Sequence, residues 1–288
     1  MDMLDISTIC ERIAVQAPYF AFTELRGLRN QVVHGTFAPE QPLGFENGPV
    51  GAAEVGRHLA ILGSCAAVAW QPASQVYYLA TKARYSRLRD VDNGESGAML
   101  HASAEVLKHD KRSMSAQAII SAEKPFAHLY CEYQALSESV FSRLFKDYHI
   151  PSLSPEGSPL SANSPYRDSI PLEFDFVDDR SILAYSPPLA PARCAGHFLN
   201  YPAWPVAIIG HTASQTIGRL LHHIVGKEIH YTVLKCDLCA HQLVSSSEPL
   251  SFHTKCVSAS AHLAHYVFET QVMRNEEVIA TVGTELCI

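Results

Sequence analysis

The sequence lacks any apolar run that approaches the about 20 residues needed to cross a bilayer, so we expect no membrane span. It also lacks a basic excess, since 22 lysines and arginines stand against 29 acidic residues and the net charge is −7. A nucleic-acid-binding chain usually carries a basic face, and this composition argues against one. Charged residues interrupt Met1–Gln31, which excludes the apolar core of a secretory leader. We therefore expect a cytoplasmic protein that binds no nucleic acid.

Dense cysteine spacing is also missing. The eight cysteines are scattered along the chain, which is typical of free thiols in a reducing compartment and not of a disulfide scaffold. Cys236 and Cys239 form a close pair, but a zinc site would need further ligands, for which only His241 and Cys256 are nearby. Their segment has the alternation of a strand. We therefore expect structural cysteines, no metal and no cofactor.

A stretch rich in proline and serine divides the chain. Residues 147–171 contain few large apolar side chains and cannot form a packed core, so they are predicted to be a linker or a surface loop. They separate lobe one, residues 1–146, from lobe two, residues 172–288, and each lobe has an ordinary domain size. With 47% hydrophobic residues, the chain can bury a sizeable core.

The two lobes share one order of elements. Each contains a helical segment rich in Gly, Ala, Ile and Leu, at Gly48–Trp70 and at Pro205–Val225. Runs with the alternation and the β-branched or aromatic enrichment of strands follow each helix. These runs are 76–88, 97–109, 112–122 and 127–136 in lobe one, and 229–244, 250–260, 265–274 and 277–288 in lobe two. The pattern predicts an α+β fold by internal duplication, in which each half wraps an antiparallel sheet around its helix and the halves pair edge to edge.

The segment Gly196–Gln215, GHFLNYPAWPVAIIGHTASQ, carries a motif. It resembles the His-Phe-x-Gly-x-Pro-x-x-Pro-Gly motif of the bacterial β-hydroxyacyl-ACP dehydratases, which continues into a helix bearing an acid and then a Gln. The residues at matching offsets are His197, Phe198, Pro202, Pro205 and Gln215. This resemblance implies the hotdog fold. A two-lobed chain of this kind resembles the double-hotdog dehydratase domains of polyketide synthases.

The sequence departs from the motif at three positions. Asn200 and Val206 replace its two glycines, and His211 stands where the family has its catalytic acid. The resemblance implies an active site between the lobes, built from the His of one lobe and the acid of the other. It therefore pairs His197 as the base with Glu54, on the helix of lobe one, as the acid.

Further side chains are predicted to support this site. Residues four apart in a helix lie on one face, which places His58 beside Glu54. A basic cluster on one strand is a solvated face that also suits the phosphate of phosphopantetheine or an acidic carrier protein. The predicted supporting or substrate-binding residues are His58, His211, Gln215, Asn200, Pro205 and Val206, and the basic cluster is Lys82, Arg84, Arg87 and Arg89.

The resemblance implies a dehydratase that acts on 3-hydroxyacyl thioesters, carried by acyl carrier protein or CoA, in fatty-acid or polyketide-type biosynthesis. Two alternatives stay open. A hotdog thioesterase would use Glu54 to activate water or to attack the carbonyl, with His197 secondary. A non-catalytic acyl-binding or assembly protein would explain the replaced glycines and the missing acid of lobe two. We expect either a monomer whose lobes form a pseudo-dimer or a homodimer.

Overall fold

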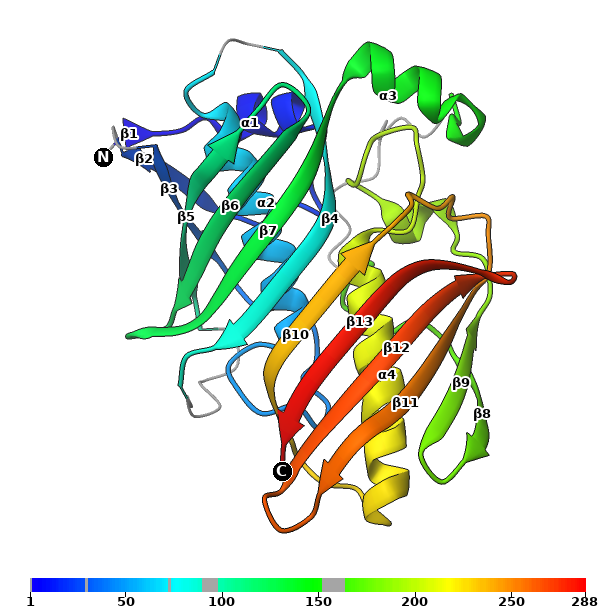
Figure 1. The fold of residues 1–288 in the computed structure, drawn as a ribbon. Coiled ribbons are helices and arrows are strands. Elements are labelled where there is room, and N and C mark those ends of the chain that lie inside the picture. Colours follow the sequence, from blue (N-terminus) through cyan, green and yellow to red (C-terminus); the bar gives the residue numbers. More distant parts are fainter. Residues whose placement is uncertain (1, 29–30, 72–73, 90–97, 152–163) are drawn as a thin grey trace.

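Each half of the chain folds as an antiparallel sheet around one long helix (Figure 1). The computed structural model describes residues 2–28, 31–71, 74–89, 98–151 and 164–288. The elements of lobe one are β1 (Asp2–Met3), α1 (Ile6–Ile13), β2 (Glu24–Leu28), β3 (Val32–Phe37), α2 (Ala52–Val68), β4 (Val76–Arg87), β5 (Leu100–His109), β6 (Ser113–Ser121), β7 (Pro125–Ser137), α3 (Glu138–Leu144) and the short 3-10 helix η1 (Lys146–Tyr148).

Lobe two repeats the arrangement with a second long helix. Its elements are β8 (Glu173–Asp178), β9 (Ser181–Ser186), the 3-10 helix η2 (Pro191–Cys194), α4 (Val206–Val225), β10 (Thr232–Ala240), β11 (Leu250–Ser260), β12 (His265–Arg274) and β13 (Glu277–Cys287). The predicted α+β class and the predicted strand runs are confirmed. Cys236 and Cys239 lie on β10, as their alternation predicted.

The sheets of the two lobes join into one. The strand order is β1-β2-β3-β5-β6-β7-β4-β10-β13-β12-β11-β9-β8, so lobe one ends at β4 and lobe two begins at β10. These two strands pair over five residue pairs, from Lys82 opposite Cys239 to Ser86 opposite Lys235. The lobes therefore meet edge to edge, with their helices on the same side of the joined sheet.

The two long helices form the centre of the core. α2 and α4 contact each other as well as the strands of their own lobes. α2 buries nearly its whole length, including Leu59, Leu62 and Cys65, because few of its side chains are large or polar. A helix that is apolar all round is expected to be covered on every side.

Several predicted boundaries are wrong by a few residues, of which two bear on the site. α2 begins at Ala52 and not at Gly48, because Gly51 is extended and acts as the N-cap. The strand predicted over 229–244 ends at Ala240. Beyond it the chain turns back to lobe two, where the Val244 carbonyl accepts the N–H of Trp204 at 2.8 Å.

One end of the predicted linker is buried. Residues 152–163 lie outside the described residues. After them, Tyr166 and Ile170 are only 2% and 3% exposed, and the Tyr166 hydroxyl donates to the Ala195 carbonyl at 2.7 Å. The large side chains of this stretch thus join the core between the lobes. Among the described helices, none has the length and apolarity to span a membrane.

Candidate active site

The start of α2 is built around a buried carboxylate. Gly51 offers no side-chain cap, and Glu46 takes over that role, since its Oε1 accepts the N–H of Ala52 at 2.7 Å. A Cβ on Gly51 would lie 3.3 Å from Glu46 Oε2, so glycine leaves the carboxylate room. Burial raises the pKa of Glu46 to about 7. The sequence interpretation missed Glu46, because it lies five residues before the N-cap Gly51 and not at the position where a capping side chain is expected.

The segment around Glu46 also ties this helix end to lobe two. The N–H of Asn47 donates to the Tyr231 carbonyl at 2.7 Å, and the N–H of Tyr231 donates to the Phe45 carbonyl at 3.0 Å. Tyr231 immediately precedes β10. Lobe two therefore fixes where α2 begins.

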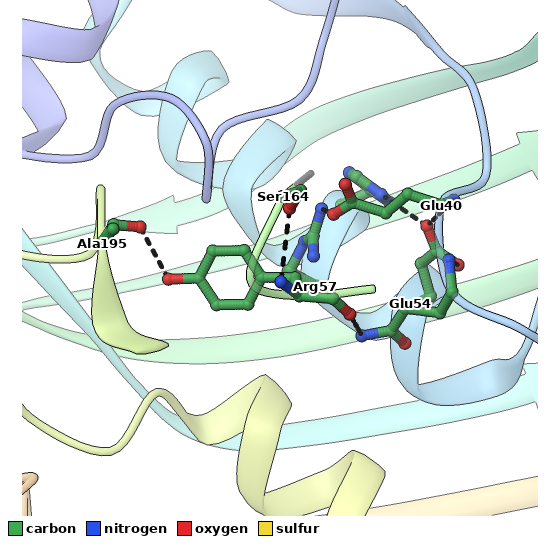
Figure 2. Close-up of polar contacts among 8 residues, drawn as sticks. Glu40, Glu54, Arg57, Ser164 and Ala195 are labelled. Carbon is green, nitrogen blue, oxygen red and sulfur yellow. Dashed lines mark hydrogen bonds and ion pairs between the residues drawn. The ribbon is translucent and has the colours of Figure 1, made fainter. Parts of the chain in front are cut away.

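Glu54 lies in the first turn of α2 and is 1% exposed. Its carboxylate accepts two backbone N–H groups, from Glu40 at 2.7 Å and from Gln41 at 3.1 Å (Figure 2). Burial raises its pKa above the ordinary value, while these bonds and the nearby Arg57 act in the opposite direction. Glu54 is thus held in one orientation with a basicity above that of an exposed glutamate.

His58 supports Glu54 from the next turn of the same helix. Its Nε2 lies 3.4 Å from Glu54 Oε1, and its ring stacks on Phe37 with 3.8 Å between centroids. Complete burial lowers its pKa well below the ordinary value, so the imidazole is neutral. The predicted neighbouring pair is therefore in contact, with His58 on the side of the core.

A cavity of about 320 Å³ brings Glu54 together with α4. His211, Ser214 and Gln215 line it from α4, and Glu46 lines it as well. The Gln215 amide nitrogen is buried and has no hydrogen-bond partner among the described residues. Burial lowers the pKa of His211, and the charge of Glu54 opposes that shift. We call this space the polar cavity.

A larger cavity of about 590 Å³ adjoins the polar cavity, and Ala53 and Ser214 line both. Small residues of both helices leave this space free, including Gly56 and Ala60 of α2 and Gly210 of α4. Its walls on the sheet side are mostly apolar or aromatic and include Tyr85, Leu129, Val233 and Leu238, with Thr81, Gln134 and Thr284 as polar exceptions. We call it the apolar cavity, and an acyl chain suits its lining.

His197 lines the apolar cavity, whereas Glu54 lines the polar one. The imidazole lies against Tyr19 and Phe198, with 4.9 Å and 4.0 Å between ring centroids. Its Nδ1 is buried and finds no partner in the part of the chain that the structure describes, and burial lowers the pKa of His197 to about 3. No hydrogen bond joins His197 to Glu54 among the described residues. The structure does not bring the predicted base and acid into one cavity.

The two helix starts explain this separation. Arg57 stands six residues after the N-cap Gly51, and His211 stands six residues after the N-cap Pro205. Arg57, and not Glu54, therefore occupies the position in lobe one that the acid has in the motif. Glu54 lies three residues earlier, which moves it about 4.5 Å along the helix axis.

Arg57 is a second residue whose role the sequence interpretation missed. It is 2% exposed, lines the apolar cavity, and forms an ion pair with Glu40. Its guanidinium lies over the rings of Tyr166 at 5.0 Å and Tyr19 at 5.6 Å. A charged residue on an apolar helix was the available signal. The partner was not predictable, because Glu40 lies on an irregular loop.

The loop that carries His197 has left-handed backbone at three positions. The φ angles are +82° at Gly196, +51° at Phe198 and +66° at Asn200. Asparagine tolerates this region better than most residues, which explains how Asn200 replaces the glycine of the motif. Pro205 caps α4, and Val206 is its first residue and lines the apolar cavity.

The basic cluster predicted to bind a carrier does not form one surface. Thr81, Ala83 and Tyr85 line the apolar cavity, so the alternating Lys82 and Arg84 point to the other face of the sheet. There Arg84 lies 3.7 Å from the carboxylate of Asp237. Arg87 points inward and donates to the Asn47 carbonyl at 3.3 Å. Arg89 is exposed at the end of β4, and its carbonyl accepts from Arg87 Nε at 3.2 Å.

Comparison with known proteins finds no matching family model and no matching curated sequence. Solved structures do match. The tesB protein of Mycobacterium avium subs. paratuberculosis is 11% identical, with 91% of this chain and 95% of that chain covered and a TM-score of 0.58. A hot dog fold protein of unknown function from Alicyclobacillus acidocaldarius is 10% identical over 95% and 98% of the chains, with a TM-score of 0.56. The 12:0-ACP thioesterase of Umbellularia californica is 10% identical over 94% and 99%, with a TM-score of 0.56.

The chain has a double hotdog fold. The expectation drawn from the motif is confirmed at the level of the fold, because these matches cover nearly the whole of both lobes. The two long helices α2 and α4 contact each other on one side of the joined sheet. The polar and apolar cavities lie between the two hotdogs, lined by α2 on one side and α4 on the other.

Proposed function

We propose that this double hotdog hydrolyses acyl thioesters, with the thioester held where the polar and apolar cavities adjoin. The observation that carries the proposal is the position of Glu54, a buried and oriented carboxylate in a polar cavity beside an apolar one. A thioester needs both environments, because its carbonyl is polar and its acyl chain is not. One of the similar structures is itself a 12:0-ACP thioesterase.

Glu54 would act as the general base. It accepts a proton from water, the water oxygen attacks the thioester carbonyl carbon, and the carbon–sulfur bond breaks as the thiolate leaves with the proton. The products are a carboxylic acid and a free thiol, so no other reactant is needed. Burial raises the pKa of Glu54, which brings its basicity closer to neutral pH.

Two groups are placed to stabilise the oxygen that gains charge. The first N–H groups of a helix have no partner within the helix. In α2 the N–H of Ala52 already donates to the carboxylate of Glu46. The next N–H, of Ala53, belongs to a residue that lines both cavities. The unpartnered amide nitrogen of Gln215 can donate to the same oxygen or to the attacking water.

The dehydratase alternative receives less support from the geometry. Among the described residues that line the apolar cavity with His197, Asp147 is the only carboxylic acid, and it lies at the exposed end. An imidazole with a pKa of about 3 is also a weak base at neutral pH. These two observations favour Glu54 over His197 as the base.

The test is to incubate the purified chain with acyl-CoA and with 3-hydroxyacyl and 2-enoyl thioesters, and to measure thiol release and hydration separately. We expect thiol release, reduced by about 100-fold or more in Glu54→Gln and within several-fold of wild type in His197→Gln. Both replacements keep the side chain polar, and thermal unfolding checks that each variant folds. Hydration without thiol release, lost in His197→Gln, would establish the dehydratase instead. Acyl-thioester binding with no turnover of either kind would establish the non-catalytic alternative.

A further inference from the structure

The joined sheet has a gap between the two lobes. Pairing between β4 and β10 ends at Lys82 opposite Cys239. From there β4 continues to Val76 with only β7 as its partner on the described strands, while β10 ends at Ala240 (Figure 1). The two chain segments diverge under α3, and among the described residues β4 and β10 form no pairs there.

The apolar cavity reaches this gap. Leu79 and Ala80 of β4 line it on one side, and Gln242 and Leu243 line it on the other. Residues of α3 and η1 lie over the gap, where the Tyr148 hydroxyl donates to the Leu243 carbonyl at 3.1 Å. These residues form the rim of an opening in the sheet.

The rim is exposed and partly apolar. Leu144 lines the cavity and is 58% exposed, and the lining residues Asp147 and His241 are exposed as well. A cavity lined at one end by exposed residues continues to the protein surface. Ala53 and Ser214 line both this cavity and the polar cavity that holds Glu54.

The volume of the apolar cavity is large for an acyl chain. At about 590 Å³, it is about four times the ~150 Å³ of an apolar cavity that holds benzene. A closed cavity would set a maximum chain length by its far wall. This cavity has an opening where that wall would be.

We infer that the apolar cavity takes long-chain acyl groups and that their tails leave the protein through the gap between β4 and the end of β10. This rests on the proposed function for the position of the thioester. The length of the acyl chain is then not limited by a closed end of the cavity. The rim residues Leu144 and Leu243 contact the part of the chain that leaves the protein. The substrate class is long-chain acyl thioesters without a sharp upper limit of length.

A bulky group at the end of the chain tests the opening. In the wild-type chain, we expect kcat/KM for octanoyl-, palmitoyl- and behenoyl-CoA to show no steep fall at the long end. Palmitoyl-CoA with a pyrene on its terminal carbon should be hydrolysed within about tenfold of unlabelled palmitoyl-CoA, because the pyrene remains outside. A closed cavity would reject the pyrene and the behenoyl chain, and either rejection overturns the inference.

Filling the gap gives the matched test. In Leu243→Trp, we expect at least a tenfold loss of kcat/KM for palmitoyl- and behenoyl-CoA and little change for octanoyl-CoA. The control is Leu263→Trp, the same replacement at a residue that is 72% exposed and outside the cavity lining. Equal losses at all lengths in Leu243→Trp, or the same pattern in both variants, contradict the inference.

Binding separates this inference from the proposed function. Pyrene fluorescence reports binding of the labelled acyl-CoA whether or not it is hydrolysed. Saturable binding that Leu243→Trp weakens, without thiol release from any substrate, would uphold the opening and overturn the hydrolase. Release of thiol from octanoyl-CoA alone, with no binding of the pyrene-labelled acyl-CoA, would uphold the hydrolase and overturn the opening.

Discussion

The carboxylate of Glu46 caps the start of α2 by accepting the N–H of Ala52 at 2.7 Å. The same side chain is 7% exposed, and burial raises its pKa to about 7. Arg87 is the charged group that favours its ionised form, while desolvation favours the neutral one. The helix start next to the candidate base therefore carries a group that ionises near neutral pH.

This predicts that the contribution of Glu46 to stability is lost as the pH rises, while the lowered pKa values of His58, His197 and His211 act on stability in the opposite direction. A carboxyl whose folded pKa lies above its unfolded value of 4.5 favours folding most fully below pH 4.5, and the advantage is lost as the pH rises to about 7. The loss is on the order of 3 kcal/mol. Glu46→Gln keeps an oxygen for the Ala52 N–H and removes the titration. Thermal unfolding across this pH range should therefore show that the stability of wild type relative to Glu46→Gln falls as the pH rises, and a difference that stays constant with pH would exclude this role.

The rate of thioester hydrolysis should have an acid limb that belongs to Glu54. Its pKa is raised by burial, so kcat/KM should fall with decreasing pH around a midpoint above 4.5, the ordinary value for glutamate. The neutral form cannot accept the proton of the attacking water. Residual activity in Glu54→Gln should show no such limb. A midpoint that is the same in both proteins would mean that another group is the base.

Arg57 and Glu40 should depend on each other for stability. Both side chains are largely buried, at 1% and 9% exposure, so removing either partner leaves an unpaired charge in the core. We expect Arg57→Met and Glu40→Gln each to lower the free energy of unfolding by about 3 to 5 kcal/mol, and the double variant to lose less than the sum. Urea unfolding measures all three.

The exposed pair of Arg274 and Glu277 is the control for that cycle. Its side chains are 26% and 51% exposed, and water screens their attraction. Arg274→Met and Glu277→Gln should each lower the free energy of unfolding by less than about 1 kcal/mol. Additive losses at Arg57 and Glu40 would show that their contact contributes nothing beyond packing.

The fold was predictable because its signals are periodic. The helices at α2 and α4 are long and apolar, and the strands alternate, so both appear in the sequence at nearly their true bounds. The duplication then implied two sheets that share an edge. The start of α2 was placed too early because its cap is Glu46, a side chain supplied by the preceding loop.

The candidate site was predictable only in part. Glu54 and His58 are neighbours, as their spacing required, and Gln215 and His211 reach the same cavity from α4. The partners of Glu54 are backbone N–H groups of an irregular loop, which no periodicity reveals. The pairing with His197 came from the resemblance, which implies a His from one lobe and an acid from the other, and Glu54 was the acid on the helix of lobe one. Matching the helix starts instead would have selected Arg57.

The loop before α4 depends on one glycine. Gly196 has a φ of +82°, and a Cβ there would lie 2.1 Å from the carbonyl oxygen of Gln16. The backbones of Gly196 and Gln16 lie against each other where the two lobes meet, and there the Gly196 carbonyl accepts the N–H of Gln16 at 2.8 Å. Gly196→Ala should therefore cost about 3 kcal/mol or more and displace His197.

Gly226→Ala is the control that separates the cost of the Cβ clash from the cost of the left-handed backbone conformation. Gly226 ends α4 with a φ of +77°, almost the same angle, but a Cβ there would meet nothing within 4 Å. Gly226→Ala should therefore lower the free energy of unfolding by only about 1 kcal/mol, the cost of holding alanine in the left-handed conformation. Urea unfolding of both variants measures the difference. If the two variants lose the same free energy, the contact between Gly196 and Gln16 is not what requires glycine, and the His197 loop is held to lobe one by its other contacts.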